Sequence, residues 1–562
     1  MKKIFAALAA ALVLFSACEP QETPTVSFAL TSDNVEVAGL TADALVVVDA
    51  TAKTVAIEVA YADKAQLAAL QVNFVGVPSD VTVENFSFDF STGATKEVAV
   101  SQNGATDTYV FSATVAKPEP KFVTLSLATA KAAKDENEQD ITVLGTPVAV
   151  AGGTAKFKGS DDLTKLAVIY TVSPANAKVY AKVDGAEVEI ANEAVLDFSD
   201  KVNGVDLVVK CEEESAVQNV KIVTTGFSSI QRVWGRYVKP ETTDANWYDE
   251  AATTVPVSDN MRNMAADAKY VYLPNTGKGL VYAFDLLTGE FVKTLAAPAE
   301  VVFGGTFKVC DANVMPNGTS SVLVVANMAM NANGNLRVYA YTSPDADPVN
   351  IINYTISDGR YGDKFSVAGT WEDGEILFFN QKDKTTMLGW KVKNGVVAAE
   401  PTVYNVQLPS NASYSAFFQY SATEWIWGGA GPLYSVWTRS GDTYTNVYQE
   451  EASDRFPTPM HDIRFVKFNE QEYMIYTRLL NNNQDAAVRF QELNAATLLD
   501  SMKGVDVTTD KQLGLGDPTK LNVTANKNGN SMGGSDVVVV GEDVYVVGCV
   551  PGAGMSCFKL VK

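Results

Sequence analysis

The sequence predicts an all-β protein with two N-terminal immunoglobulin-like β-sandwiches followed by a C-terminal β-propeller. Three observations support this class. The 562 residues include 39 glycines, 21 prolines and one histidine, and Val, Thr and Tyr are frequent, as in strand-rich proteins. Up to about residue 225, apolar and polar residues alternate in short runs at roughly ten-residue spacing. After residue 262, a pattern of four short strands recurs at roughly 50-residue spacing, which is typical of a propeller.

The N-terminal segment predicts export. Residues 1–18, MKKIFAALAAALVLFSAC, contain two lysines, an apolar stretch too short to span a bilayer, and small residues before Cys18. This segment resembles a bacterial lipoprotein signal with Cys18 as the lipidated residue. Phe15 replaces the usual Leu, so the match is to the looser lipobox of Bacteroidetes-type lipoproteins. The alternative is an ordinary cleaved secretion signal.

Residues 19–25 are expected to form an acidic tether. The acidic residues after Cys18 resemble the tag that sends such lipoproteins to the cell surface, and the alternative is a tether with no addressing role. The expected location is therefore the outer membrane, lipid-anchored and exposed at the cell surface, with the lipid anchor as the one membrane contact. The net charge of −22, with no basic cluster, argues against nucleic acid as a partner.

Two sandwiches are predicted at residues 26–117 and 122–225, separated by the linker KPEPK. They read as copies of one another, because FDFS at residues 88–91 corresponds to LDFS at residues 196–199 and similar strands follow both motifs. Neither contains the Cys and Trp core pair of antibody domains. They resemble the Ig-like modules that bacterial surface proteins use as stalks.

The propeller is predicted at residues 227–562. Its first blade, from Arg262 to Leu295, has four short strands joined by turns rich in Asn, Thr and Gly. Five later segments repeat this pattern: Thr306 to Ile356, Asp363 to Val406, Tyr414 to Gln449, His461 to about Val507, and Gly533 to Leu560.

The last segment has three strands, and Gln231 to Val238 is expected to supply the fourth. Such a pairing would close the ring and leave no unpaired sheet edge. Six blades are therefore predicted, with seven as the alternative if Ala495 to Asn530 contains another blade.

The propeller region also carries a family resemblance. GGTFKVCDANVMPNGTSSVLVVANMAM, RVYAYTSPDADPV and RYGDKFSVAGTW resemble an uncharacterised Bacteroidetes lipoprotein family with a domain-of-unknown-function propeller behind Ig-like domains. The resemblance implies architecture and location but no activity.

Ligand-binding candidates are expected just before each innermost strand, where a propeller channel opens. Such a ring of donors, acceptors and an aromatic residue suits a sugar or a short peptide. The alternative is that these residues are polar because they line a water-filled channel. The candidates are Arg262, Asn263, Thr306, Lys308, Asp363, Lys364, Tyr414, His461, Asp462, Asn530 and Ser531.

No metal or catalytic constellation is recognisable. His461 is the one histidine, and the adjacent Asp462 should point to the opposite face of a strand, so a triad is not expected. No cofactor is predicted, and Asp267 and the pair of Asp345 and Asp347 lack the spacing of a calcium loop. Trp425 and Trp427 share one strand face and either bind carbohydrate or pack between blades. Cys549 and Cys557 flank a turn. The sequence does not decide whether they form a disulfide.

Three functions are compatible with these features. The preferred one is a cell-surface protein whose propeller binds a glycan or a glycan-processing partner, with the Ig-like domains as a stalk. The second is a propeller polysaccharide lyase or glycosidase using His461 or Tyr414 as acid or base beside Arg262 or Lys364. The third is a structural protein that docks to another envelope protein.

Overall fold

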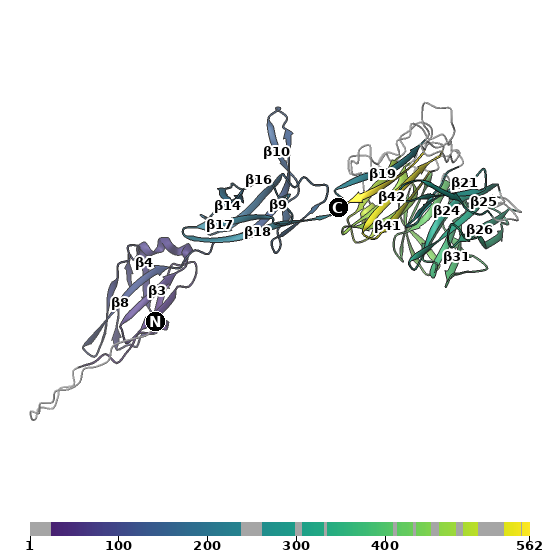
Figure 1. The fold of residues 1–562 in the computed structure, drawn as a ribbon. Coiled ribbons are helices and arrows are strands. Elements are labelled where there is room, and N and C mark those ends of the chain that lie inside the picture. Colours follow the sequence, from purple (N-terminus) through teal and green to yellow (C-terminus); the bar gives the residue numbers. More distant parts are fainter. Residues whose placement is uncertain are drawn as a thin grey trace, which may run out of the picture. The chain divides into compact units, whose positions relative to one another are not determined.

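The computed structural model describes residues 24–237, 261–297, 306–330, 334–408, 413–430, 434–450, 460–478, 487–503, 533–551 and 554–562 (Figure 1). Cys18, the predicted lipidation site, lies outside these residues. The chain divides into two compact units. One is made of Met1–Ala155 and Asp162–Ile222, and the other of Lys156–Asp161 and Val223–Lys562. Within the described residues, no helix has both the length and the hydropathy needed to cross a membrane.

The first sandwich packs two sheets over one apolar core. Its strand orders are β1-β4-β6 and β2-β3-β8-β7-β5. Alternating residues of β3 point inward, so that Val55, Ile57 and Val59 are buried and meet Tyr109 and Phe111 of β8. Two 3₁₀ helices, η1 (Ser32–Asn34) and η2 (Tyr61–Ala69), accompany the strands β1 (Val35–Ala38), β2 (Leu45–Asp49), β3 (Thr54–Val59), β4 (Leu70–Phe74), β5 (Val81–Thr82), β6 (Phe86–Phe88), β7 (Lys96–Gln102) and β8 (Ala105–Val115).

The second sandwich repeats this strand order. Its sheets are β10-β9-β13-β16, with β11 also on β9, and β12-β18-β17-β14-β15. Thus β9-β13-β16 corresponds to β1-β4-β6, and β12-β18-β17-β14 corresponds to β3-β8-β7-β5, as the sequence predicted for two copies. The strands are β9 (Lys121–Lys134), β10 (Asp140–Leu144), β11 (Val148–Ala149), β12 (Thr154–Lys158), β13 (Leu166–Ser173), β14 (Lys178–Val183), β15 (Ala186–Glu189), β16 (Ala194–Leu196), β17 (Val205–Cys211) and β18 (Glu214–Thr225).

Six sheets follow in the described part of the chain, and each is one blade of a propeller. Blade 1 is β20 (Ala265–Ala266), β21 (Tyr270–Asn275), β22 (Leu280–Asp285) and β23 (Phe291–Thr294). Blade 2 is β24 (Phe307–Asn317), β25 (Ser320–Met330), β26 (Asn335–Tyr341), β27 (Val349–Thr355) and the short β28 (Arg360–Tyr361). Blade 3 is β29 (Ser366–Gly369), β30 (Asp373–Phe379), β31 (Thr386–Lys393), β32 (Val396–Val397) and β33 (Thr402–Asn405).

The remaining blades complete the ring. Blade 4 is β34 (Ser413–Gln419), β35 (Glu424–Ala430), β36 (Ser435–Ser440) and β37 (Thr443–Gln449). Blade 5 is β38 (Met460–Phe468), β39 (Gln471–Arg478) and β40 (Ala487–Leu493), followed by the one-turn helix α1 (Leu498–Met502). Blade 6 is β41 (Gly534–Val540), β42 (Asp543–Val550), β43 (Gly554–Val561) and β19 (Ser229–Tyr237).

The ring closes as the sequence predicted. Strand β19 pairs antiparallel with β43, so that Ser229 lies opposite Val561. The inner strands contact one another in the order β20, β24, β29, β34, β38 and β41, and β41 contacts β20 again. Because β38 and β41 touch directly, no further blade stands between blades 5 and 6. Residues 504–532, where part of a seventh blade was the alternative, lie outside the described residues.

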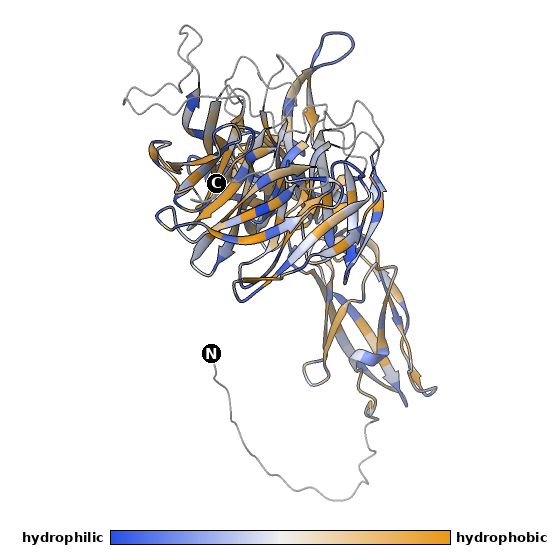
Figure 2. Ribbon diagram, turned by 90° about the vertical axis from the view of Figure 1, so that its right-hand side faces the viewer, coloured by the Kyte–Doolittle hydropathy of each residue, from blue (hydrophilic) through white to orange (hydrophobic). Residues whose placement is uncertain are grey.

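Apolar side chains fill the spaces between blades. Figure 2 shows hydrophobic residues along many of the propeller strands. Trp425 and Trp427 are both 1% exposed, and they pack with side chains of blades 3 and 4. Of the two roles predicted for this pair, the structure therefore shows packing between blades. Cys549 and Cys557 are free thiols, because Cys549 lies opposite Met555 and Cys557 opposite Val547.

Candidate functional site

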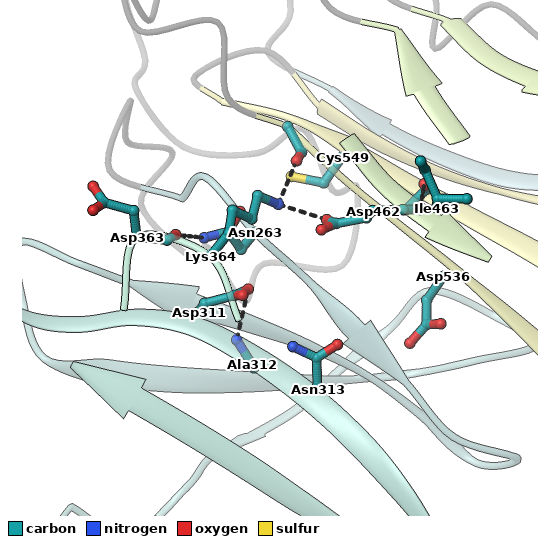
Figure 3. A network of polar contacts seen from close by, with 12 residues as sticks. Asn263, Asp311, Ala312, Asn313, Asp363, Lys364, Asp462, Ile463, Asp536 and Cys549 are labelled. Carbon is teal, nitrogen blue, oxygen red and sulfur yellow. Dashed lines mark hydrogen bonds and ion pairs between the residues drawn. The ribbon is translucent and has the colours of Figure 1, made fainter. Parts of the chain in front are cut away.

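The two ends of the propeller axis differ in how polar side chains fill them. At the end where the inner strands begin, four polar side chains form a buried cluster that we call the polar plug (Figure 3). At the other end, farther along the same strands, there is a cavity of about 760 Å³, within the usual range for small-molecule sites. The polar plug consists of Asn263, Asp311, Lys364 and Asp462, each at most 4% exposed.

Lys364 is the centre of the polar plug. Its Nζ lies 2.7 Å from Oδ2 of Asp462 and donates to the carbonyl oxygen of Gly533 at 2.9 Å. Lys364 precedes blade 3, whereas Gly533 precedes blade 6 on the opposite side of the ring. Asn263, before blade 1, donates through Nδ2 to the carbonyl oxygens of Cys310 and Asp363. The bond to Cys310 joins neighbouring blades 1 and 2, whereas the bonds from Asn263 to Asp363 and from Lys364 to Gly533 join blades that are not neighbours.

A bulge turns Asp462 toward the axis. The register of β38 on β39 shifts between His461 and Arg464, and Asp462 has a φ of 47°. Aspartate tolerates this left-handed conformation better than most residues, and bulges commonly redirect a side chain. The carboxylate of Asp462 is consequently engaged by Lys364.

Asp311 makes the polar plug sensitive to protonation. Its carboxylate accepts hydrogen bonds from the backbone N–H groups of Ala312 and Phe365, at 2.9 and 2.8 Å. Burial raises the pKa of Asp311 to about 7, and the charge of Asp462 acts in the same direction, while Lys364 opposes it. The polar plug thus holds one lysine and two carboxyl groups, and burial raises the pKa of Asp311 into the neutral range.

The cavity at the other end, which we call the axial cavity, is lined by all six inner strands. Arg464 of β38 lies at its floor, where Nε donates to Oδ1 of Asp536 at 2.7 Å and Nη2 donates to Oδ1 of Asn313 at 2.9 Å. Asn313 belongs to blade 2 and Arg464 to blade 5, on opposite sides of the ring. Their hydrogen bond therefore also crosses the axis.

The other polar group at the floor is Ser366. Its Oγ is buried and has no hydrogen-bond partner among the described residues, although Ser366 lines the axial cavity. Asp536, in contrast, is fully engaged, since its carboxylate also accepts from the backbone N–H groups of Ala266 and Val537. The floor therefore combines a fixed charge pair with a buried hydroxyl whose hydrogen-bonding capacity is unused among the described residues.

Aromatic side chains form one wall of the axial cavity. Phe418, Tyr420 and Phe465 come from blades 4 and 5, and the rings of Tyr420 and Phe465 meet edge to face at 5.0 Å. The guanidinium of Arg464 lies 5.7 Å from the centre of the Phe418 ring. Burial, together with the hydrogen bond to Glu472, raises the pKa of Tyr420 to about 12. Tyr420 is thus a neutral, half-buried aromatic surface with a fixed hydroxyl.

Hydroxyl groups surround a second part of the axial cavity, between blades 1 and 2. This part, which we call the lateral lobe, lies beside Asp267 at the end of β20. The carboxylate of Asp267 is saturated, because it accepts from Tyr272, Ser321 and two backbone N–H groups. The hydroxyl residues of the lateral lobe are Thr319, Ser320, Ser321, Tyr341, Thr342 and Ser343.

The candidates predicted from the sequence lie at the polar-plug end, and none lines the axial cavity. Arg262, Asn263, Asp363, Lys364, His461 and Asp462 are buried. Arg262 lies over the Phe307 ring, and Asp363 pairs with Arg360. Tyr414 is half-buried under the Arg360 guanidinium, and Thr306 and Lys308 are exposed. Asn530 and Ser531 lie outside the described residues. The assignment of all these candidates as ligand-binding residues stays a prediction from the sequence.

The residues of the cavity floor were missed, although the sequence held a signal for them. Each is a polar residue inside an otherwise apolar inner strand, as in the runs CDANVM and GSDVVVV. Such residues in a buried strand must have hydrogen-bond partners or face a cavity. The four residues in question are Asn313, Ser366, Arg464 and Asp536.

Comparison with known proteins identifies a domain type. A family model described as "Domain of unknown function (DUF4623)" matches residues 243–511, within the region where the sequence resembled a domain-of-unknown-function propeller. A solved DUF4623 family protein from Bacteroides eggerthii is 15% identical, with a TM-score of 0.46 and coverage of 79% of this chain and 99% of that chain. PQQ-bound aldose sugar dehydrogenase from Streptomyces coelicolor is 9% identical, with a TM-score of 0.32 and coverage of 58% and 99%. No curated protein matches the sequence. Both TM-scores lie below 0.5.

Proposed function

We propose that this protein is a lipid-anchored, cell-surface binding protein whose propeller binds an uncharged carbohydrate in the axial cavity. The two sandwiches serve as its stalk. The observation that carries the proposal is the composition of the axial cavity, where an aromatic wall faces a floor of amide, guanidinium and hydroxyl groups. Sugars need both surfaces, because their ring faces are apolar and their edges carry hydroxyls that need hydrogen-bond partners.

The charge of the axial cavity supports an uncharged ligand. Two of its three acidic residues form ion pairs, and the third accepts four hydrogen bonds. Arg464 pairs with Asp536, and Lys293 pairs with Asp345. Asp267 is saturated by hydrogen bonds, and Lys269 lies in the same lining. A charged ligand would bring a charge into a partly buried site whose ionised groups already have partners, so the charge of the ligand would have no counter-ion there.

Binding, rather than hydrolysis, fits the state of the carboxylates. Glycoside hydrolysis uses two carboxyl groups that reach the scissile bond. Asp536 is held by Arg464 and by two backbone N–H groups, and Asp267 accepts four hydrogen bonds. Both carboxylates thus fix the shape of the site, which is the behaviour expected of a binding pocket.

A glycan array probed with the purified full-length protein tests this proposal. The array carries neutral glucans, mannans, xylans and arabinans alongside acidic pectin and glycosaminoglycan fragments. Selective binding to neutral glycans is expected. Failure to bind any glycan, or binding confined to acidic ones, would contradict the proposal.

Two variants, one inside the axial cavity and one outside it, test whether glycan binding takes place in the axial cavity. We expect Tyr420→Ala to lower the affinity about tenfold or more, since stacking on one aromatic ring contributes on the order of 1–2 kcal/mol. Tyr354→Ala is the control, because Tyr354 is also half-buried but lies on β27, where it packs on Trp390 and does not line the axial cavity. Affinity is measured by isothermal titration. Equal losses in the two variants would place the site elsewhere.

A further inference from the structure

We infer that the axial cavity is a blind pocket that takes the end of an oligosaccharide chain, with the following sugars lying along the lateral lobe. The inference rests on the proposed function and adds to it the part of the carbohydrate that is recognised. It excludes binding in the middle of a polymer threaded through the channel.

The channel is closed behind the axial cavity by side chains that cross the axis. The first barrier is the hydrogen bond between Arg464 and Asn313, which joins opposite blades 5 and 2. Behind it lies the polar plug, where Lys364 reaches Asp462 and Gly533 (Figure 3). Lys364 is 1% exposed and Asp462 is 4% exposed, so this ion pair is shielded from solvent. A polymer entering the axial cavity therefore meets a floor rather than an exit.

Exposure decreases along the axial cavity from the lateral lobe to the floor. Thr319, Ser320 and Thr342 are exposed, and Ser321 is intermediate. Ser366, at the floor, is 3% exposed and Asp536 is 6% exposed. This gradient gives the site one wet entrance and one dry end. A terminal sugar can be enclosed at the floor, and the exposed hydroxyls of the lateral lobe offer a path for the sugars that follow.

The chemistry of the two parts agrees with this orientation. The enclosed part holds a guanidinium, an amide, a buried hydroxyl and the aromatic wall, which together offer one sugar both polar and apolar surface. The lateral lobe offers hydroxyl groups, which bind sugars weakly and with little preference. Selectivity is therefore expected for the terminal sugar and tolerance for those that follow.

Stoichiometry against chain length tests the inference. The probes are disaccharides, tetrasaccharides and octasaccharides of each neutral glycan on the array, titrated into the full-length protein by calorimetry. One protein per chain at every length, with affinity rising up to the tetrasaccharide and then constant, is expected. More than one protein per octasaccharide would overturn chain-end binding while leaving carbohydrate binding intact. No binding by any probe would overturn both proposals.

Ring-shaped oligosaccharides provide a second test, because they have no chain end. Linear maltohexaose and the cyclic hexamer of the same α-linked glucose form one pair, and linear and cyclic β-glucans form another. Binding to the linear member alone is expected, and equal affinity for both members would overturn the inference.

A variant in the lateral lobe separates the two parts of the site. Thr342→Trp should lower the affinity for the tetrasaccharide about tenfold and leave that for the disaccharide within about twofold, because the indole would block the exit path alone. Val396→Trp is the control, since Val396 is 69% exposed and lies outside the axial cavity. Equal weakening of disaccharide and tetrasaccharide by Thr342→Trp would contradict the proposed orientation.

Discussion

The two ends of the propeller axis are built from the same six inner strands but use polar residues for different purposes. At the polar plug, Lys364 and Asp462 bind each other and are both buried. In the axial cavity, Arg464 and Asp536 also bind each other, but a volume of about 760 Å³ remains in front of them. The comparison teaches that a ring of polar residues does not make a site by itself. A site also needs space and hydrogen-bonding groups that the protein has not already satisfied.

The largest expected effect is the loss of the cation in the polar plug. Lys364→Met leaves Asp462 buried without its partner and should lower the free energy of unfolding by about 3–5 kcal/mol. All seven tryptophans lie between residues 234 and 437, so tryptophan fluorescence during urea unfolding reports on the propeller.

Two further variants make this measurement decisive. Lys382→Met breaks an exposed pair with Asp358 and should cost less than about 1 kcal/mol. The double variant Lys364→Met with Asp462→Leu should recover much of the loss, because no buried charge is left unpaired. If Lys364→Met costs no more than Lys382→Met, the polar plug is not the closed end of the axis.

The second expected effect is a pH dependence confined to the polar plug. The folded-state pKa of Asp311 is raised to about 7, so the folded protein binds a proton there more tightly than the unfolded chain does. The stabilising contribution of this proton is fully present below about pH 4 and is lost as the pH rises through about 7. At about 1.4 kcal/mol per pKa unit, the change amounts to at most about 4 kcal/mol.

Asp311→Asn isolates this contribution, because it replaces the carboxyl group by a neutral amide of similar size. The difference in unfolding free energy between the variant and the original protein should change between about pH 4 and 7 and stay constant above that range. Asp345→Asn is the control, since Asp345 is exposed at the cavity rim. A difference that is constant across the whole range for Asp311→Asn would show that its carboxyl group is ionised in the folded protein at all of these pH values.

The smallest expected effect on stability belongs to the axial cavity. Ser366→Ala removes a hydroxyl that has no hydrogen-bond partner among the described residues, so the free energy of unfolding should change by less than about 0.5 kcal/mol. The affinity for the neutral glycan that binds best should nevertheless fall several-fold, by calorimetry. Unchanged affinity would remove Ser366 from the site, and a stability loss of more than about 1 kcal/mol would mean that its hydroxyl is satisfied in the folded protein.

Much of the fold was predictable because its signals are local. The four short strands predicted between Arg262 and Leu295 are β20 to β23 in the structure. The limits of most other blades lie within a few residues of their predicted positions, whereas the predicted end of the fifth segment, near Val507, lies outside the described residues. Alternation and turn residues determine such elements over short stretches of sequence. The closing strand was also predictable, because a three-stranded last blade implied a partner elsewhere in the chain.

The open end of the axis was not predictable, because it depends on contacts between distant blades. Arg464 and Asn313 are 151 residues apart, and Lys364 and Gly533 are 169 residues apart. The bulge at Asp462 adds to the difficulty, since it interrupts the alternation from which side-chain direction is inferred. Sequence patterns thus placed the candidates in the ring of inner strands, but the choice of end depended on side chains that meet only after the ring has formed.

The pairing of β19 with β43 also has a consequence for the order in which the propeller can form. Ser229 is among the first propeller residues to leave the ribosome, and its partner Val561 follows 332 positions later. Until then, β19 has an unpaired edge and blade 6 cannot be completed, so ring closure is a late and long-range event of the kind that slows folding. The early blades must therefore be kept from aggregating until the last strand arrives.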